Sequence, residues 1–298
     1  MRKKIFNGLI TALVTPFKNA AKQIDFDALE KLLDLQIKAQ VDGILVAGST
    51  GESLSLSYEE YISLISFTIK YVNGRTLVIA GCCASDIDKA VMMVKECERL
   101  AVQGIMCVTP FYSRPSQEGL YQYFKTIHDV CNLPIMLYTV PSRTGVNLND
   151  ETVIKLAKLD RIAAIKDATG NLEAPLRIRS KLDMDKEFAF LCGIDSLALG
   201  FNAQGGSGLV SVTANVAPFE CKEIQLLWNH RKTEEAFQLH MKLMPVYSAI
   251  SIETNPVSVK YAASLRKFCT SEVRLPLCKL MPSSSKLIKE VFSEVVIR

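Results

Sequence analysis

The sequence has few of the features that several function classes require. Only three of its 298 residues are histidine, and none is spaced from another histidine or a cysteine as metal ligands are. Zinc chemistry and a histidine general base are therefore not expected, and we predict no metal and no organic cofactor. No stretch approaches the ~20 apolar residues of a membrane helix, so no membrane partner is expected. The glycine-rich dinucleotide fingerprint GxGxxG is absent after the first predicted strand, which argues against a Rossmann fold.

The net charge and the cysteines restrict the expected partners and the expected cellular compartment. The net charge of +4 is small for this length and is not concentrated in one segment, which gives no reason to expect a nucleic-acid partner. The nine cysteines include no CxxC pair, and several lie within apolar patterns, namely Cys97, Cys107, Cys131 and Cys192. Reduced cysteines that fill a core indicate a cytoplasmic protein. We interpret residues 1–17 as a first strand with a basic tip rather than a signal peptide, because the apolar run is short and interrupted.

Short apolar runs alternate with longer amphipathic stretches. Three of the amphipathic stretches have helical periodicity, at 26–40, 58–72 and 88–102. The apolar runs predict eight strands, at 8–14, 43–48, 77–81, 105–110, 134–140, 162–166, 188–193 and 208–213. Near-continuous apolar strands, each followed by a helix, indicate a parallel sheet that is buried on both faces. Eight such units predict an α/β fold, the (β/α)8 TIM barrel, rather than an open doubly wound sheet.

The strand pattern stops after Asn215, and four helical stretches follow. The first of them completes the eighth βα unit, and the others predict a small helical appendage. We therefore expect a catalytic barrel over residues 1–230 and a C-terminal helical domain over residues 231–298.

Candidate site residues lie near the carboxyl ends of the predicted strands and in the loops after them, where a barrel has its active site. They are Ser49 and Thr50 in GSTGES, Tyr112 in TPFYSRP, Tyr138 at a strand end, Arg143 in VPSRTG, Lys166 at the end of IAAIK, and Val210 in the last strand. No histidine and no acid pair joins this set. The inventory predicts one site built from a lysine, tyrosines, hydroxyls and an arginine.

Lys166 suggests the chemistry. An ammonium drawn into an apolar barrel is driven toward the neutral amine, because desolvation penalises the charged form. A neutral amine condenses with ketones to form a Schiff base, and hydroxyl groups can shuttle the protons. The Arg143 guanidinium is suited to hold a carboxylate. These residues indicate an aldolase-type lyase acting on a 2-keto acid. A structural lysine paired with an acid such as Asp167, or pyridoxal phosphate held by QGGSG, remain alternatives.

The motifs carry a resemblance. GSTGES, TPFYSRPSQEGLYQYF, LYTVPSRTG, IKDATGN and GLVSVTANVAP, in this order, resemble the 4-hydroxy-tetrahydrodipicolinate (dihydrodipicolinate) synthases over essentially the whole chain. These belong to the pyruvate-dependent class I aldolases, with N-acetylneuraminate lyase. The resemblance implies condensation of pyruvate with L-aspartate 4-semialdehyde, the first committed step of lysine biosynthesis through diaminopimelate. It also implies a homotetramer arranged as a dimer of dimers.

The resemblance assigns roles residue by residue. Lys166 matches the Schiff-base lysine. Tyr138, Ser49 and Tyr112 match the proton relay, in which the last tyrosine reaches into the neighbouring subunit's site, and many relatives have threonine in place of Ser49. Thr50 and the backbone of Val210 match pyruvate-binding positions, and Arg143 matches the arginine that holds the semialdehyde's carboxylate.

Two features of the sequence predict which activity and which regulation this chain has within the family. Sialic-acid lyases lack the arginine of SRTG, so Arg143 favours the synthase over another pyruvate-dependent aldolase such as a sugar-acid lyase; a non-catalytic small-molecule-binding barrel is the alternative from another class. Synthases that lysine inhibits resemble each other in having an acid early in the helix after the third strand and an asparagine shortly before it. In this sequence Lys89 stands at the position of the acid and Ser85 at that of the asparagine. Other changed positions are Tyr58, Tyr61 and Phe111. A cation at Lys89 would repel a bound lysine, so we expect weak or no inhibition by lysine.

Overall fold

The computed structural model describes residues 5–183 and 185–298. Its eight parallel strands form a closed barrel in the order β1-β10-β9-β8-β7-β6-β5-β4, which confirms the predicted (β/α)8 fold. The strands are β1 (Gly8–Ala12), β4 (Gly43–Val46), β5 (Leu77–Cys82), β6 (Gly104–Val108), β7 (Ile135–Thr139), β8 (Ile162–Asp167), β9 (Ala189–Cys192) and β10 (Gly208–Ser211). Their residues are almost all buried, as expected for parallel strands covered on both faces. The basic tip predicted at Arg2–Lys4 lies outside the described residues.

The helices are α1 (Phe26–Lys38), α2 (Tyr58–Val72), α3 (Ile87–Arg99), α4 (Gln117–Val130), α5 (Pro141–Thr144), α6 (Asp150–Ala157), α7 (Ala174–Arg179), α8 (Ala198–Ala203), α9 (Pro218–Asn229), α10 (Thr233–Ile250), α11 (Val257–Leu265) and α12 (Pro282–Glu294). The three helices predicted at 26–40, 58–72 and 88–102 are present as α1, α2 and α3, with ends that differ from the prediction by no more than three residues, and four helices follow Asn215 as predicted. A two-stranded antiparallel ribbon, β2 (Phe17–Lys18) with β3 (Gln23–Ile24), was not predicted. Strands this short carry no periodic signal.

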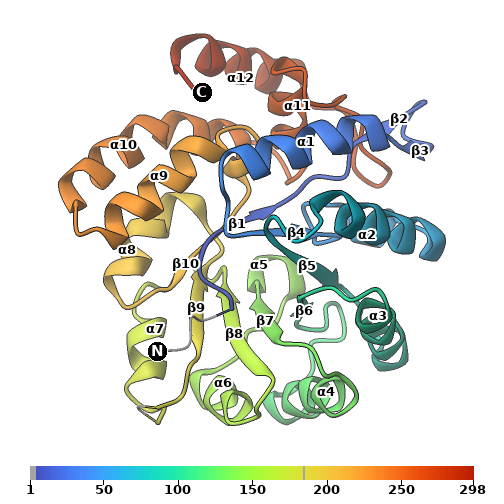
Figure 1. Cartoon of the computed structure of the whole chain (residues 1–298), viewed down its shortest axis with the longest axis vertical. Helices are drawn as coiled ribbons and strands as arrows, with labels where there is room; N and C mark the ends of the chain where they lie inside the picture. The colour runs from blue at the N-terminus through green and yellow to red at the C-terminus, as the bar shows by residue number, and fades with distance from the viewer. Residues whose placement is uncertain (1–4, 184) are drawn as a thin grey trace. The chain divides into compact units, whose positions relative to one another are not determined.

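The chain divides into two compact units. The first comprises Ile79–Val210 with the residues up to Asn7. In it β6, β7, β8 and β9 pair in parallel, one after another (Figure 1). Helices α3, α4, α6 and α7 belong to the same unit, and α4 packs against both α3 and α6. This unit carries Lys166, Tyr138, Arg143, Tyr112 and Val210.

The second unit comprises Gly8–Val78 and Ser211–Arg298. Here β1 pairs with β4, and α10 packs against α9 and α12 (Figure 1). Capping residues define both ends of α2 in this unit. Ser57 caps α2 and forms a capping box with Glu60, and Asn73 ends the helix in the left-handed conformation. This unit carries Ser49 and Thr50.

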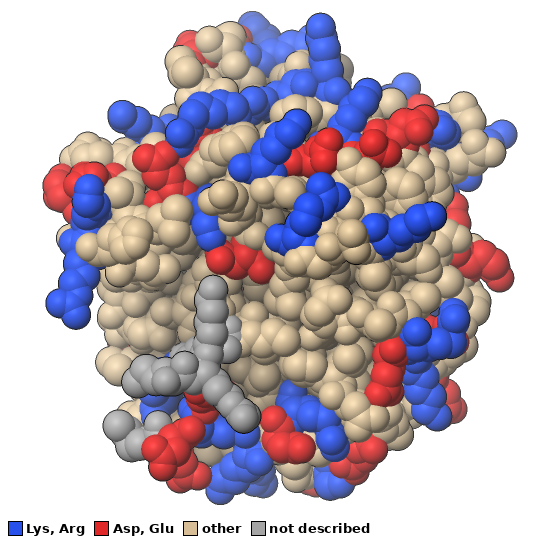
Figure 2. All heavy atoms as spheres, in the orientation of Figure 1, with Lys and Arg blue, Asp and Glu red and all other residues tan. Residues whose placement is uncertain are grey.

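The surface is mixed in charge, as the small net charge suggests. Figure 2 shows Lys and Arg side chains interspersed with Asp and Glu on the face in view. Along the described ranges, no helix is long and apolar enough to cross a bilayer. Within those same ranges, no cluster of three or more His, Cys, Asp or Glu side chains is placed to hold a metal ion.

Candidate functional site

Strand register places Lys166 beside Tyr138. In the β7–β8 ladder, Ile135 pairs with Ile162 but Met136 pairs with Ala164, so β8 contains one extra residue at this point. Beyond this irregularity Tyr138 lies opposite Lys166. Without the extra residue Ile165 would occupy that place and Lys166 would face the other side of the sheet, because successive side chains alternate. The bulge therefore determines that the lysine and the tyrosine share a face.

Lys166 is buried, as the apolar run before it predicts, with 4% of its surface exposed. Its Nζ atom lies 4.3 Å from the centre of the Tyr138 ring, which is itself buried. No carboxylate in residues 5–183 and 185–298 forms an ion pair with this ammonium. A ring face attracts a cation but cannot neutralise it, so Lys166 is buried against the ring with no counter-charge from the described carboxylates.

Gly193 makes room for the lysine. A Cβ atom at this position would lie 3.2 Å from Lys166 Cε, 2.9 Å from Ala168 Cβ and 3.0 Å from the Asp167 carbonyl oxygen. Any larger residue would therefore push against the lysine side chain. The sequence pattern did not single out this glycine, although CGID at the end of the predicted seventh strand marks its place.

Asp167, the alternative partner for Lys166, is engaged elsewhere. Its Oδ1 accepts a 2.8 Å hydrogen bond from the Thr169 backbone N–H. Burial raises the pKa of the Asp167 carboxyl above its ordinary value, against the hydrogen bonds from Thr169 that lower it. The neighbouring thiol of Cys192 has its pKa raised by burial to about 12, so it remains a thiol near neutral pH.

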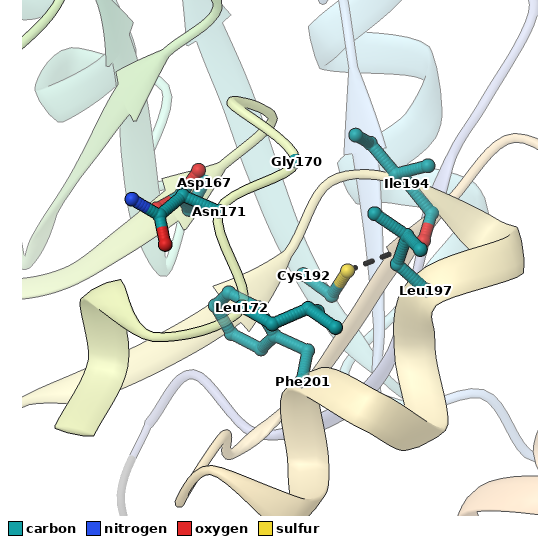
Figure 3. A pocket seen from close by; sticks show the side chains of 8 residues that line it. All are labelled: Asp167, Gly170, Asn171, Leu172, Cys192, Ile194, Leu197 and Phe201. Atoms are coloured by element: carbon teal, nitrogen blue, oxygen red, sulfur yellow. Dashed lines mark hydrogen bonds between the residues drawn. The ribbon is translucent and has the colours of Figure 1, made fainter.

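A small recess lies on the Asp167 side of the strand (Figure 3). Its lining consists of Asp167, Gly170, Asn171, Leu172, Cys192, Ile194, Leu197 and Phe201. In Figure 3 the Cys192 Sγ atom is joined to the Ile194 carbonyl oxygen, at 3.2 Å. Neither Lys166 nor Tyr138 lines this recess, so we do not place a substrate in it.

The loops that carry Tyr112 and Arg143 are tied together. The Arg114 Nε–H donates to the Gly145 carbonyl oxygen at 2.9 Å. Gly145 ends α5 with a φ of 72°, a left-handed conformation that favours glycine. Arg143 itself is exposed on α5, and Tyr112 is 96% exposed with a φ of 71°. Val210, the other predicted residue of this unit, is fully buried in β10.

The predicted hydroxyl pair lies in the second unit, directly after β4. Ser49 is half-buried and Thr50 is buried. The Thr50 Oγ1 atom accepts a 2.9 Å hydrogen bond from the side-chain amide of Asn255. Two residues later, Glu52 has a φ of 53° and accepts hydrogen bonds from Lys260 Nζ at 2.6 Å and from the Arg274 backbone N–H at 2.9 Å.

Sequence reasoning missed Asn255 and the Glu52–Lys260 pair. These residues are 205 and 208 positions from their partners, so no local pattern could have revealed the contacts. The only available signal was a second lysine within an apolar helical run, PVSVKYAASL, which raises the same question of burial as Lys166.

A closed barrel whose buried lysine at the end of β8 forms no ion pair with any described carboxylate is compatible with a (β/α)8-barrel lyase. The comparisons with known proteins agree. The chain belongs to the dihydrodipicolinate synthetase family, whose model matches residues 5–294.

Individual relatives match over almost their whole length. A 4-hydroxy-tetrahydrodipicolinate synthase from Rickettsia bellii is 47% identical over 294 residues, with 99% of each chain covered. A solved structure described as the first monomeric dihydrodipicolinate synthase variant is 35% identical, with a TM-score of 0.95 over 99% of this chain and 98% of that one. The dihydrodipicolinate synthase from Acinetobacter baumannii, solved in complex with pyruvate, is 33% identical, with a TM-score of 0.94 over 98% of this chain and 99% of that one.

Proposed function

We propose that this protein condenses pyruvate with L-aspartate 4-semialdehyde to give 4-hydroxy-tetrahydrodipicolinate, the first committed step of lysine biosynthesis through diaminopimelate. The observation that carries the proposal is Lys166, buried beside Tyr138 and not ion-paired with any carboxylate of residues 5–183 and 185–298, in a chain of this family. The relative solved with pyruvate supports the identity of the first substrate.

The proposed reaction begins at Lys166. Its neutral amine attacks the keto carbon of pyruvate, and loss of water gives an iminium. The iminium draws electrons from the methyl group, which loses a proton to become an enamine. The enamine carbon then attacks the aldehyde carbon of the semialdehyde and forms the new carbon–carbon bond. Hydrolysis or ring closure by the semialdehyde's amine frees Lys166, and no metal or organic cofactor is needed for any of these steps.

Other residues hold protons and substrates in this proposal. Tyr138, Ser49 and Tyr112 relay protons between the amine, the departing water and solvent. The Thr50 hydroxyl and the backbone of Val210 bind pyruvate. The Arg143 guanidinium, exposed on α5, binds the semialdehyde's carboxylate through its planar fork.

We propose a cytoplasmic homotetramer built as a dimer of dimers, with a catalytic barrel over residues 1–230 and a helical domain over 231–298. Tyr112 supports the dimer. A tyrosine that is 96% exposed on a left-handed backbone is unusual in an isolated chain, and packing against a second copy would bury it. Light scattering at micromolar concentration tests the assembly: a tetramer is expected, Tyr112→Ala should weaken the dimer, and a monomer for the wild type would contradict it.

We also propose that lysine is a weak inhibitor or none. Lys89 is exposed at the start of α3, where an acid would be needed to pair with a bound lysine's ammonium. The Ser85 hydroxyl is engaged by the Phe111 backbone, with its oxygen 3.0 Å from the carbonyl oxygen and 3.2 Å from the amide nitrogen. Half-inhibition at sub-millimolar lysine would contradict this proposal.

Two experiments test the function. Incubation with pyruvate followed by borohydride reduction should leave a stable adduct on Lys166, located by peptide mass spectrometry. Absence of that adduct would rule out the Schiff-base mechanism and favour a binding barrel. A coupled assay should then show turnover with aspartate semialdehyde and none with N-acetylneuraminate; the reverse result would identify a sugar-acid lyase.

The carboxylate clamp has its own test. We expect Arg143→Ala to raise the KM for aspartate semialdehyde by about 10- to 100-fold, because a hydrogen bond to a charged group contributes roughly 1.5–3 kcal/mol. Trapping of pyruvate on Lys166 should be nearly unchanged, since the clamp acts on the second substrate. Unchanged semialdehyde kinetics would remove Arg143 from the site.

A further inference from the structure

The loop that carries Ser49 and Thr50 is held by the segment that leads into α11. The Asn255 Nδ2–H donates to Thr50 Oγ1 at 2.9 Å, and the Thr50 side chain is buried. Asn255 lies two residues before the start of α11 at Val257. Both residues belong to the second unit, and nothing in the reaction proposed above assigns a role to Asn255.

The direction of this hydrogen bond restricts what the Thr50 hydroxyl can do. A hydroxyl has one proton to donate and two lone pairs that accept. The amide N–H of Asn255 occupies a lone pair and cannot accept the proton. The Thr50 proton is therefore directed toward another acceptor. For a residue that binds a keto acid, the matching acceptor is the substrate carboxylate.

We propose that Asn255 is a positioning residue that sets Thr50 as a hydrogen-bond donor to the carboxylate of the keto-acid substrate. The inference rests on the proposed function and extends it. It assigns to the segment before α11 a part in selecting a substrate whose carboxylate is next to the reacting ketone, over a ketone without one.

The loop that carries Thr50 and the segment that carries Asn255 are each held in place by further hydrogen bonds. A positioning role for Asn255 requires this. On the loop side, Glu52 is held by the buried ammonium of Lys260 at 2.6 Å and by the Arg274 backbone N–H at 2.9 Å. On the helix side, the Val257 N–H donates to the Thr254 carbonyl at 2.8 Å and the Glu253 N–H to Ser258 Oγ at 3.1 Å. Lys260 belongs to the first turns of α11, so the loop is held both by the segment before this helix and by the helix itself.

The test compares Asn255→Ala with the isosteric Asn255→Asp. We expect Asn255→Ala to raise the KM for pyruvate about 3- to 10-fold, with kcat and the KM for the semialdehyde changed less than twofold. Asn255→Asp should raise it further, because its carboxylate accepts the Thr50 proton and repels the substrate's carboxylate. The pyruvate concentration for half-maximal trapping on Lys166 should shift in parallel. Should Asn255→Ala fail to fold, Asn255→Asp alone decides the test.

A double-mutant cycle with Thr50→Val separates positioning from a purely structural role. Without the hydroxyl there is no proton to direct, so Asn255→Ala should change the pyruvate KM less than twofold in that background. The same increase in both backgrounds, or equal changes in both substrates' KM values, would overturn the inference. If wild-type protein traps no pyruvate, the proposed function fails instead, and the two failures are thereby distinguished.

Discussion

Two lysines of this protein are buried in different units, and their surroundings differ in one respect. Lys166 in β8 and Lys260 in α11 are 4% and 0% exposed. Each ammonium lies over an aromatic ring, at 4.3 Å from the centre of Tyr138 and at 4.1 Å from the centre of Phe17. Lys260 is paired with the Glu52 carboxylate at 2.6 Å, whereas Lys166 has no such partner among the described residues.

The comparison shows how a buried lysine can have either of two roles, as a nucleophile or as a partner in a structural ion pair. Burial lowers the pKa of Lys260, and Glu52 opposes that effect. The contact between Lys260 and Glu52 ties the loop to the helix. Lys166 has no ion-pair partner among the described residues, and in the proposed reaction it is the nucleophile rather than one half of a structural ion pair. The same substitution at both positions should therefore give opposite results.

Lys166→Met should have the largest effect. Methionine is apolar and similar in length to lysine. The variant's free energy of unfolding should therefore be within about 1 kcal/mol of the wild-type value or higher than it. Turnover should fall by several orders of magnitude, because the nucleophile is gone. Borohydride trapping with pyruvate, read by mass spectrometry, should give no adduct. An adduct of wild-type stoichiometry on another lysine would contradict the assignment.

Tyr138→Phe separates the ring from its hydroxyl. The ring remains beside Lys166 Nζ, so the contact between the ring and the amine should persist. If the hydroxyl relays protons, kcat should fall about 10²- to 10⁴-fold, as for the loss of a general acid–base group. Stopped-flow trapping should show slower adduct formation with the same final yield. A kcat within threefold of the wild type would show that the ring alone is needed.

Lys260→Met should reverse the pattern seen at Lys166. Removing one partner of a buried ion pair leaves the Glu52 carboxylate without its counter-charge, which typically costs about 3–5 kcal/mol of unfolding free energy. Urea denaturation measures this loss, and pyruvate should still form an adduct on Lys166 in the folded protein.

Glu52→Gln in combination with Lys260→Met provides the matched control. The amide oxygen of glutamine can still accept the Arg274 backbone N–H, and no buried charge remains. The double variant should therefore recover part of the stability lost by Lys260→Met. A double variant less stable than Lys260→Met would show that the charge of Glu52 was not the cause.

Local sequence patterns predicted the surroundings of Lys166 but not those of Lys260. The apolar run 162–165 predicted a buried Lys166, and strand periodicity predicted the barrel. The bulge that pairs Met136 with Ala164 was not predictable, because it depends on which residues of two strands meet. Asn255 and Lys260 meet their partners more than 200 residues away, and only the folded chain brings them together.

A second ion pair, between Arg274 and Glu60, lies beside Lys260 and gives a pH test. The Arg274 guanidinium lies 4.3 Å from the centre of the same Phe17 ring and is hydrogen-bonded to both carboxylate oxygens of Glu60, at 2.5 and 2.6 Å. This hydrogen bonding lowers the pKa of Glu60 below its ordinary value of 4.5. A lowered carboxyl pKa means that the stabilisation is fully present above pH 4.5 and is lost as the pH falls through the folded-state pKa.

Glu60→Gln should therefore have the smallest and most pH-dependent effect. Glutamine can still accept the Ser57 backbone N–H, which preserves the capping box of α2. We expect a loss of about 1–2 kcal/mol at pH 7, since the pair is partly exposed. The difference from the wild type should shrink below pH 4.5 as the wild-type carboxyl takes up its proton. Urea denaturation at pH 7, 5 and 3.5 measures it, and a difference independent of pH would show that Glu60 acts through packing rather than charge.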